Sequence, residues 1–175
     1  SVFHGFGSSW VIPGTGIILN NRLTGFSLDP ASPNIIEPGK RPAHTLNAFT
    51  AVNPDGTLYL VGGTPGANIQ VQTNLQLITN VVDLKLNVQE ATEAPRWQHL
   101  NAHGQSTTEE AGSGVLEIEN RVPTAVLDEL RAKGHDVKEL VAWGHRSSVQ
   151  LMQVLPNATY AFGSDPRCEG HAAGI

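Results

Sequence analysis

Residues 45–68 read TLNAFTAVNPDGTLYLVGGTPGAN, and this stretch decides the fold that the sequence predicts. Its turn-forming run Asn53-Pro54-Asp55-Gly56 separates two apolar segments, 45–52 and 57–61, which is typical of a β-hairpin. A Gly-rich run, 62–68, follows at once, and the apolar residues of 72–86 then recur near helical spacing. The stretch therefore predicts a hairpin that is joined to a helix by a glycine-rich loop.

The flanking sequence predicts further short elements. Upstream, residues 10–12 and 17–19 indicate two short strands around a tight turn, and residues 29–42, with four prolines, indicate an ordered surface loop. Downstream we expect a short helix over 87–98 that ends near Pro95, a strand over 114–122, a helix over 123–134, and a closing hairpin of 147–155 and 159–162. No repeat or linker divides the chain, so residues 1–175 are predicted to form a single domain.

The predicted strand over 114–122 has alternating chemistry. Leu116 and Ile118 alternate with Glu117 and Glu119, which predicts one apolar face and one charged, half-exposed face. Near the carboxy terminus, Asp165-Pro166-Arg167 places a carboxylate and a guanidinium two residues apart. We expect this pair to form an ion pair that pins the tail.

Composition excludes several classes of protein. The formal net charge is −5 and no run of Lys and Arg is present, which argues against nucleic acid and an anionic membrane as partners. Cys168 is the single cysteine, so an intrachain disulfide cannot form. No apolar run approaches the roughly 20 residues that span a bilayer. We expect a soluble protein, and the compartment stays open between cytoplasm and periplasm.

Two segments are candidates for ligand binding. Gly62, Gly63 and Gly66 would let backbone N–H groups approach an anion or an oxyanion, although the run matches neither phosphate-binding nor dinucleotide-binding fingerprints and could be a plain turn. The run 40–45, KRPAHT, places two cations before an imidazole and a hydroxyl, or else is an exposed basic turn. His99 and His103 stand four residues apart without an HExxH pattern, so we expect no metal and no cofactor.

A nucleophile-elbow serine is not indicated by the sequence. Ser113 lies in Gly112-Ser113-Gly114, but Ala111 and Val115 occupy the two positions where that motif requires Gly. The sequence therefore argues against a serine hydrolase of that type.

Taken together, several segments resemble the gamma-glutamyltranspeptidase family in the same order along nearly the whole chain. They are FGSS (6–9), GIILNN (16–21), PGKRP (38–42), GTPGA (63–67), residues 87–96, and GSDPR (163–167). The resemblance implies an α+β fold, the αββα Ntn-hydrolase sandwich, completed by a partner large subunit. It also implies that residues 1–175 are the carboxy-terminal portion of the small subunit.

The resemblance implies a proenzyme that cleaves itself and so exposes a Thr at the amino terminus of its small subunit. The α-amine of such a residue can act as general base for its own hydroxyl. The resemblance places that Thr roughly twenty residues, or slightly fewer, before Ser1. It is not in this chain. Ser1 would then match the family's second hydroxyl, which hydrogen-bonds the nucleophile. In the alternative interpretation, Ser1 is itself the nucleophile.

The family's other site residues fall on identifiable positions. The oxyanion-hole pair falls on Gly66 and Ala67, where Ala keeps its backbone donor. The substrate-binding pair after Lys-Arg-Pro falls on His44 and Thr45, and the asparagine near the nucleophile falls on Phe3. The resemblance therefore implies that the scaffold for stabilising a tetrahedral intermediate is retained.

The positions that grip a glutamyl α-amino group have changed. They fall on Arg22 and Gly25, so the aspartate is lost and a cation is added, which disfavours an ammonium group. Arg22 and His44 would suit the carboxylate of a compact amide instead, as in the oxamate amidohydrolase-like branch of the family. The alternatives are a gamma-glutamyltransferase or glutathione hydrolase, and a non-catalytic member of the family.

Overall fold

The computed structural model describes residues 2–101 and 114–173. The chain divides into two compact units, Ser1–Thr45 and Leu46–Ile175, and each is described by itself. Of the residues that the structure describes, all those in regular strands lie in the second unit. The expectation of a single domain over 1–175 stays a prediction.

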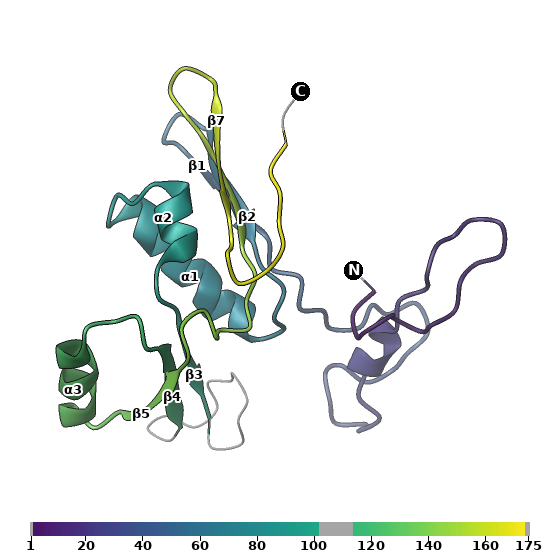
Figure 1. The fold of residues 1–175 in the computed structure, drawn as a ribbon. Helices are drawn as coiled ribbons and strands as arrows, with labels where there is room; N and C mark the ends of the chain where they lie inside the picture. The colour runs from purple at the N-terminus through teal and green to yellow at the C-terminus, as the bar shows by residue number, and fades with distance from the viewer. Residues whose placement is uncertain (1, 102–113, 174–175) are drawn as a thin grey trace. The chain divides into compact units, whose positions relative to one another are not determined.

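The second unit contains a four-stranded antiparallel sheet in the order β1-β2-β6-β7 (Figure 1). Its strands are β1 (Phe49–Val52), β2 (Leu58–Gly63), β6 (Gln150–Val154) and β7 (Tyr160–Ser164). Asn53 N–H donates to Thr57 O at 2.8 Å, and Asp55 Oδ1 accepts from Thr57 N–H at 2.9 Å. Both predicted hairpins are confirmed, because the side chains of each turn fix it locally.

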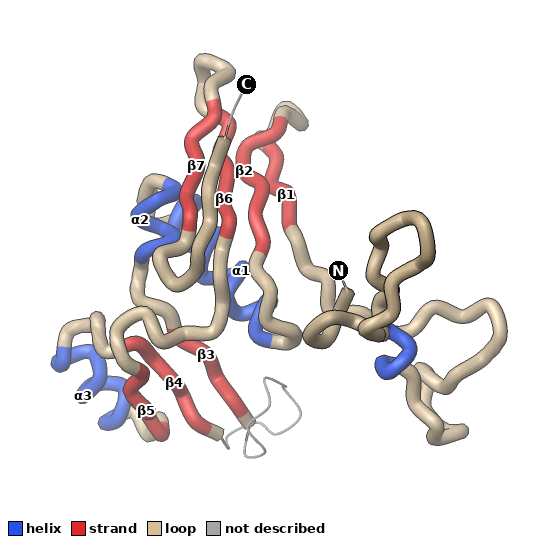
Figure 2. Tube along the Cα trace, turned by 45° about the vertical axis from the view of Figure 1, so that its right-hand side comes forward, coloured by secondary structure: helices blue, strands red, loops and turns tan. Residues whose placement is uncertain are grey.

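Two helices, α1 (Ile69–Val82) and α2 (Val88–Glu93), pack on one face of this sheet (Figure 2). The core between them is aliphatic and consists of Leu60, Leu77, Val81, Val88, Ala91, Val149 and Leu151. The Asn87 side chain caps α2 by accepting from Glu90 N–H at 2.9 Å, and the Glu90 carboxylate accepts from Asn87 N–H. The predicted order of strand, glycine-rich loop and helix is confirmed, although α1 begins and ends earlier than 72–86.

A second sheet has the order β3-β4-β5, with β3 (Trp97–Leu100) antiparallel and β5 (Asp136–Leu140) parallel to β4 (Val115–Glu119). Helix α3 (Thr124–Ala132) forms the crossover from β4 to β5. The predicted strand and helix of this region are confirmed, whereas β3 and β5 were not predicted. The expected charged and half-exposed face of β4 is wrong at one end, because Glu119 is 0% exposed.

The first unit is built mainly from turns. Its one short helix among the described residues is a 3₁₀ turn, η1 (Arg22–Gly25). The two strands predicted over 10–12 and 17–19 reduce to a single bridge, Val11↔Ile18. Pro13 has no N–H to extend that ladder. Residues 29–42 form the predicted loop.

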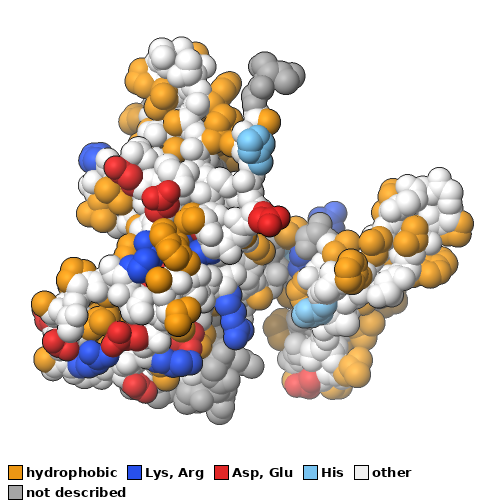
Figure 3. Space-filling view, viewed as in Figure 1, with side chains coloured by type: hydrophobic (Ala, Val, Ile, Leu, Met, Phe, Trp, Pro, Cys, Tyr) orange, Lys and Arg blue, Asp and Glu red, His pale blue; other side chains and the backbone are white. Residues whose placement is uncertain are grey.

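The described elements confirm the predicted α+β class: two sheets with three α-helices. None of the helices within residues 2–101 and 114–173 has the length and apolar character to cross a bilayer. Charged side chains gather over the part of the molecule that holds α3, whereas the hairpin tips above it are largely hydrophobic or uncharged (Figure 3).

Candidate functional site

The predicted oxyanion loop lies between β2 and α1. Gly66 has a φ of 134° and Ala67 a φ of 49°, and their carbonyls accept from Ile69 and Gln70 at 3.1 and 3.3 Å. Among the hydrogen bonds of the described residues, neither the Gly66 nor the Ala67 amide is a donor. Two free N–H groups therefore stand at the amino-terminal end of α1, where the dipole of a 14-residue helix favours negative charge.

Contacts on both sides hold this loop in place. The buried Thr64 hydroxyl accepts from Ser148 N–H at 3.0 Å and donates to Pro65 O at 2.8 Å. Gly62 is needed for close packing rather than for ligand approach, because a Cβ there would lie 2.8 Å from the Phe49 ring. The backbone of the loop is therefore positioned before any ligand arrives, as an oxyanion hole requires.

In the first unit, the structure brings Phe3 and Arg22 together. The Arg22 guanidinium carbon lies 4.5 Å from the centre of the Phe3 ring, within the range of a cation–π contact. Asn21 organises this approach: its side chain accepts from His4 N–H at 3.1 Å, and its own N–H donates to Val2 O at 3.3 Å. The two predicted substrate-binding residues, Phe3 and Arg22, are thus neighbours.

Gly25 follows Arg22 in η1 and packs against the segment that carries His44. A Cβ at position 25 would lie 2.9 Å from the carbonyl oxygen of Ala43, closer than real side chains approach a backbone atom. An aspartate cannot stand there without a backbone shift. His44 is exposed and Thr45 is half-buried.

Asn34 joins these two segments and was not predicted from the sequence. Its amide nitrogen donates to Gly25 O, and its Oδ1 accepts from Ala43 N–H at 3.0 Å. One side chain therefore ties the turn after Arg22 to the residue before His44. A single Asn inside a proline-rich loop carries no local signal of such a bridge. Ser1, the other predicted site residue, lies outside the described residues.

A buried charge cluster lies in the second unit, formed by Arg96, Glu119, Asp165 and Arg167. Arg167 Nη2 lies 2.6 Å from Glu119 Oε2, and Arg167 Nη1 lies 3.0 Å from Asp165 Oδ1. Arg96 pairs with the other oxygen of Asp165. The predicted Asp165–Arg167 pair is confirmed. Arg96 and Glu119 were missed because they come from distant segments.

Aromatic and imidazole rings border the buried charge cluster. The Trp143 ring lies under the guanidinium groups of Arg121 and Arg167, at 3.4 and 5.0 Å. His145 is 3% exposed, and its Nδ1 lies 2.7 Å from the Ser147 hydroxyl. No hydrogen-bond partner of His145 Nε2 is found in the described part of the chain.

The buried charge cluster lowers the pKa values of Glu119 and His145, which favours the charged form of the first and the neutral form of the second. Burial alone would raise the pKa of Glu119, but hydrogen bonds from Arg167 and Arg121 outweigh it and lower the pKa to about 2. Burial and the Arg96 charge lower the pKa of His145 from 6.5 to about 4. At neutral pH the cluster therefore holds a charged Glu119 and a neutral His145.

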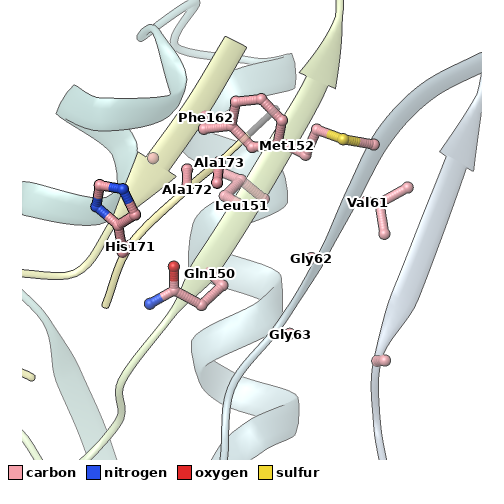
Figure 4. Close-up of a pocket in the computed structure, with 12 residues that line it drawn as sticks. Val61, Gly62, Gly63, Gln150, Leu151, Met152, Phe162, His171, Ala172 and Ala173 are labelled. Atoms are coloured by element: carbon pink, nitrogen blue, oxygen red, sulfur yellow. The ribbon is translucent and has the colours of Figure 1, made fainter. Parts of the chain in front are cut away.

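The sheet face opposite the helices is open. It carries a hollow of about 560 Å³ between β2, β6, β7 and the tail segment 171–173 (Figure 4). Its lining includes Val61, Leu151, Met152 and Phe162, with Gln150 and His171 as the larger polar groups. The hollow reaches Gly63 but not Gly66, so it is a separate feature from the predicted oxyanion loop. Within residues 2–101 and 114–173, no group of three or more His, Cys, Asp or Glu could hold a metal ion.

Two solved enzyme structures resemble the fold of this chain. A Helicobacter pylori gamma-glutamyltranspeptidase mutant, T380A, superposes with a TM-score of 0.75 at 29% identity, over 96% of this chain and 90% of that chain. A cephalosporin acylase from Bacillus halodurans superposes with a TM-score of 0.77 at 33% identity, over 98% of this chain and 31% of that chain. The fold is shared with these enzymes.

Sequence similarity identifies the family to which the chain belongs within this class of enzymes. The Gamma-glutamyltranspeptidase family model matches residues 1–175, and the chain belongs to this family. It is 38% identical to the oxamate amidohydrolase proenzyme of Klebsiella pneumoniae, over 99% of this chain and 32% of that protein. It is 36% identical to the glutathione hydrolase proenzyme of Escherichia coli, over 93% of this chain and 27% of that protein. The chain thus spans about a third of the length of the curated relatives it matches.

Proposed function

We propose that this chain is the carboxy-terminal portion of the small subunit of an Ntn amidohydrolase that hydrolyses a small, oxamate-like amide. Membership of the gamma-glutamyltranspeptidase family supports the reaction class. The likeness to the Klebsiella oxamate amidohydrolase proenzyme, which extends over 99% of the chain, supports the choice of branch.

In the proposed reaction, the hydroxyl of an N-terminal Thr outside this chain attacks the amide carbon, and the α-amine of the same residue takes its proton. The Gly66 and Ala67 amides donate to the oxyanion of the tetrahedral intermediate. The protonated α-amine passes this proton to the amide nitrogen, the C–N bond breaks and ammonia leaves. Water then hydrolyses the ester bond of the acyl-enzyme and frees the acid. In this reaction the Ser1 hydroxyl forms a hydrogen bond with the attacking Thr. In the alternative interpretation, Ser1 is itself the attacking group.

The observation that carries the substrate assignment is the packing of Gly25 against Ala43. Because a Cβ there would lie 2.9 Å from a carbonyl oxygen, this position has no room for a carboxylate that could pair with a glutamyl ammonium. Arg22, stacked on Phe3, instead offers a cation in the same 3₁₀ turn. A substrate with a carboxylate beside a compact amide suits these residues, with His44 and Thr45 completing the pocket.

The partner in this proposal is the large subunit of the same proenzyme. The curated relatives are proenzymes about three times as long as the matched region, whereas the Helicobacter chain is covered to 90%. In an αββα sandwich a second sheet packs on the sheet face opposite the helices. The open, largely apolar face of β1-β2-β6-β7 has the chemistry to receive it.

Ammonia release from oxamate and from a gamma-glutamyl amide, measured with the full enzyme, tests the proposal. We expect release from oxamate and little or none from the glutamyl amide. Release from the glutamyl amide alone would instead favour a glutathione hydrolase or gamma-glutamyltransferase, the alternative that the Escherichia coli relative supports.

A non-catalytic family member is the second alternative. The mass of the natural small chain separates it from the proposal, because an N-terminal Thr requires roughly twenty residues before Ser1. A chain of the expected larger mass that releases ammonia from neither amide would contradict the enzyme assignment for these substrates.

A further inference from the structure

Helix α1 has an unusual distribution of polarity. The side that faces the sheet and the core is largely polar for a buried face: Gln70, Thr73, Asn74, Leu77 and Val81. Next to this buried face, on the side that also carries the half-buried Thr79, four aliphatic residues lie in one row along the helix. We call this row the outer stripe of α1, and it consists of Val71, Leu75, Ile78 and Val82. Val71 and Leu75 are 60% and 59% exposed, and the other two are half-buried.

Three polar residues of α1, Gln72, Asn74 and Gln76, donate hydrogen bonds to other segments of the second unit. Gln72 and Gln76 face β3, where the Gln72 amide accepts from His99 N–H at 2.7 Å and donates to His99 O at 3.0 Å. Gln76 donates to Trp97 O at 2.9 Å, and Asn74 donates to Asn47 O. These side chains cover the free edge of β3 and anchor the helix. The positions of Gln72, Asn74 and Gln76 therefore fix the rotation of α1 about its axis, which leaves the aliphatic stripe outside.

An outer stripe of this kind differs from the surface of an ordinary amphipathic helix. Surface helices carry charged and polar residues on the face away from the core. Among its 14 residues α1 has no Asp, Glu, Lys or Arg, in its first turn, its last turn or between them. Contiguous exposed apolar residues on a folded unit mark an interaction site. The outer stripe of α1 thus has the character of an interior surface.

We propose that the outer stripe of α1 is covered by an aliphatic surface of the large subunit. This inference rests on the two-subunit assembly proposed above. The chain spans 32% of its Klebsiella relative, so about two thirds of such a protein is present to supply the cover. The hollow on the sheet and the outer stripe of α1 have no residue in common, so they are two separate apolar surfaces. A long partner chain can cover both, whereas a two-fold contact between copies would cover only one.

Cysteine labelling of the full two-subunit enzyme tests this assignment. Leu75→Cys places a thiol in the stripe, and Leu84→Cys is the matched control, since Leu84 is the same residue type, is 62% exposed and lies beyond the end of the helix. Iodoacetamide labelling, mapped by peptide mass to separate it from Cys168, gives the rate at each site. We expect labelling at 75 to be at least about ten times slower than at 84 in the native enzyme, and equal in urea.

Three outcomes are distinguishable. Equal native rates at 75 and 84, in an enzyme that still contains both subunits, overturn the proposal. Protection at 75 that disappears on dilution while the large subunit stays bound identifies a second copy as the cover, and also overturns it. If Leu75→Cys does not yield assembled enzyme, Val71→Cys is used with the same criteria. If the natural protein has no large subunit, the proposed function itself is contradicted. The mass of the natural protein shows this independently of the labelling.

Discussion

The two compact units are stabilised by different kinds of contact. Among the described residues of the first unit, 2–45, no side chain is fully buried, and side chains such as Asn21 and Asn34 hold turns by hydrogen bonds to the backbone. The second unit has an aliphatic core around Leu60 and a buried charge cluster around Glu119, both 0% exposed.

This difference separates the proposed binding residues from the part of the chain that has a buried core. Phe3, Arg22 and His44 stand on a unit held by exposed and half-buried hydrogen bonds, which open locally at low cost. Gly66 and Ala67 stand on the backbone between a core strand and α1. Substitutions in the first unit should therefore act on substrate binding, and those in the second on global stability.

The largest expected effect is on the buried charge cluster. Asp165→Ala removes the carboxylate that pairs with Arg96 and Arg167, so the free energy of unfolding should fall by about 3–5 kcal/mol. The control is Glu37→Ala in the first unit, which removes a pair with Lys40 at 3.4 Å on an exposed loop and should change little. Urea unfolding of the full enzyme measures both, and equal effects would contradict the contrast between the units.

Acid should destabilise the second unit through His145. Its pKa in the folded state, about 4, lies below the ordinary 6.5, so its stabilising contribution is complete above pH 6.5 and is lost as the pH falls toward 4. The loss is roughly 3 kcal/mol, at about 1.4 kcal/mol for each unit of pKa. Glu119 adds a separate loss between pH 4.5 and about 2.

His145→Asn keeps an acceptor for Ser147 N–H but cannot be protonated in this range. The thermal unfolding midpoint of this variant should therefore depend less on pH between 6.5 and 4.5 than that of the natural protein. Parallel pH profiles would show that His145 does not control the acid sensitivity.

Asn34→Ala should reduce substrate binding without much loss of global stability. It removes the bridge between Gly25 O and Ala43 N–H, so Arg22 and His44 lose their fixed separation. We expect the KM for oxamate to rise about tenfold with a smaller change in kcat. Asn34→Asp retains the acceptor for Ala43 N–H and should recover part of the loss. A fall in kcat alone would argue against this positioning role.

The smallest expected effect is that of His44→Ala, which removes an exposed imidazole from the proposed pocket. The KM should rise several-fold, while cleavage of the proenzyme proceeds as before, because His44 is proposed to contact substrate only. Gel analysis of subunit formation and steady-state kinetics separate the two steps. Unchanged kinetics would remove His44 from the site.

Local chemistry was enough to predict both hairpins of the first sheet and the glycine-rich loop. The turn Asn53-Pro54-Asp55-Gly56 fixes its own hairpin with hydrogen bonds between neighbours, and Pro123 predicts the start of α3. The strands around Pro13 were over-predicted, because a turn alone does not provide a ladder. Short polar strands such as β5 were missed, because their pairing depends on distant partners.

The sequence by itself determined the order of hairpin, glycine-rich loop and helix, and the family resemblance that implies the α+β class, since each depends on residues that are close along the chain. Only the tertiary structure decided that Glu119 is buried, that Asn34 bridges Gly25 and Ala43, and that Leu75 faces outward. The physical reason is common to all three. Burial and side-chain bridges depend on which distant segments meet, and helical spacing cannot tell which apolar face meets the core.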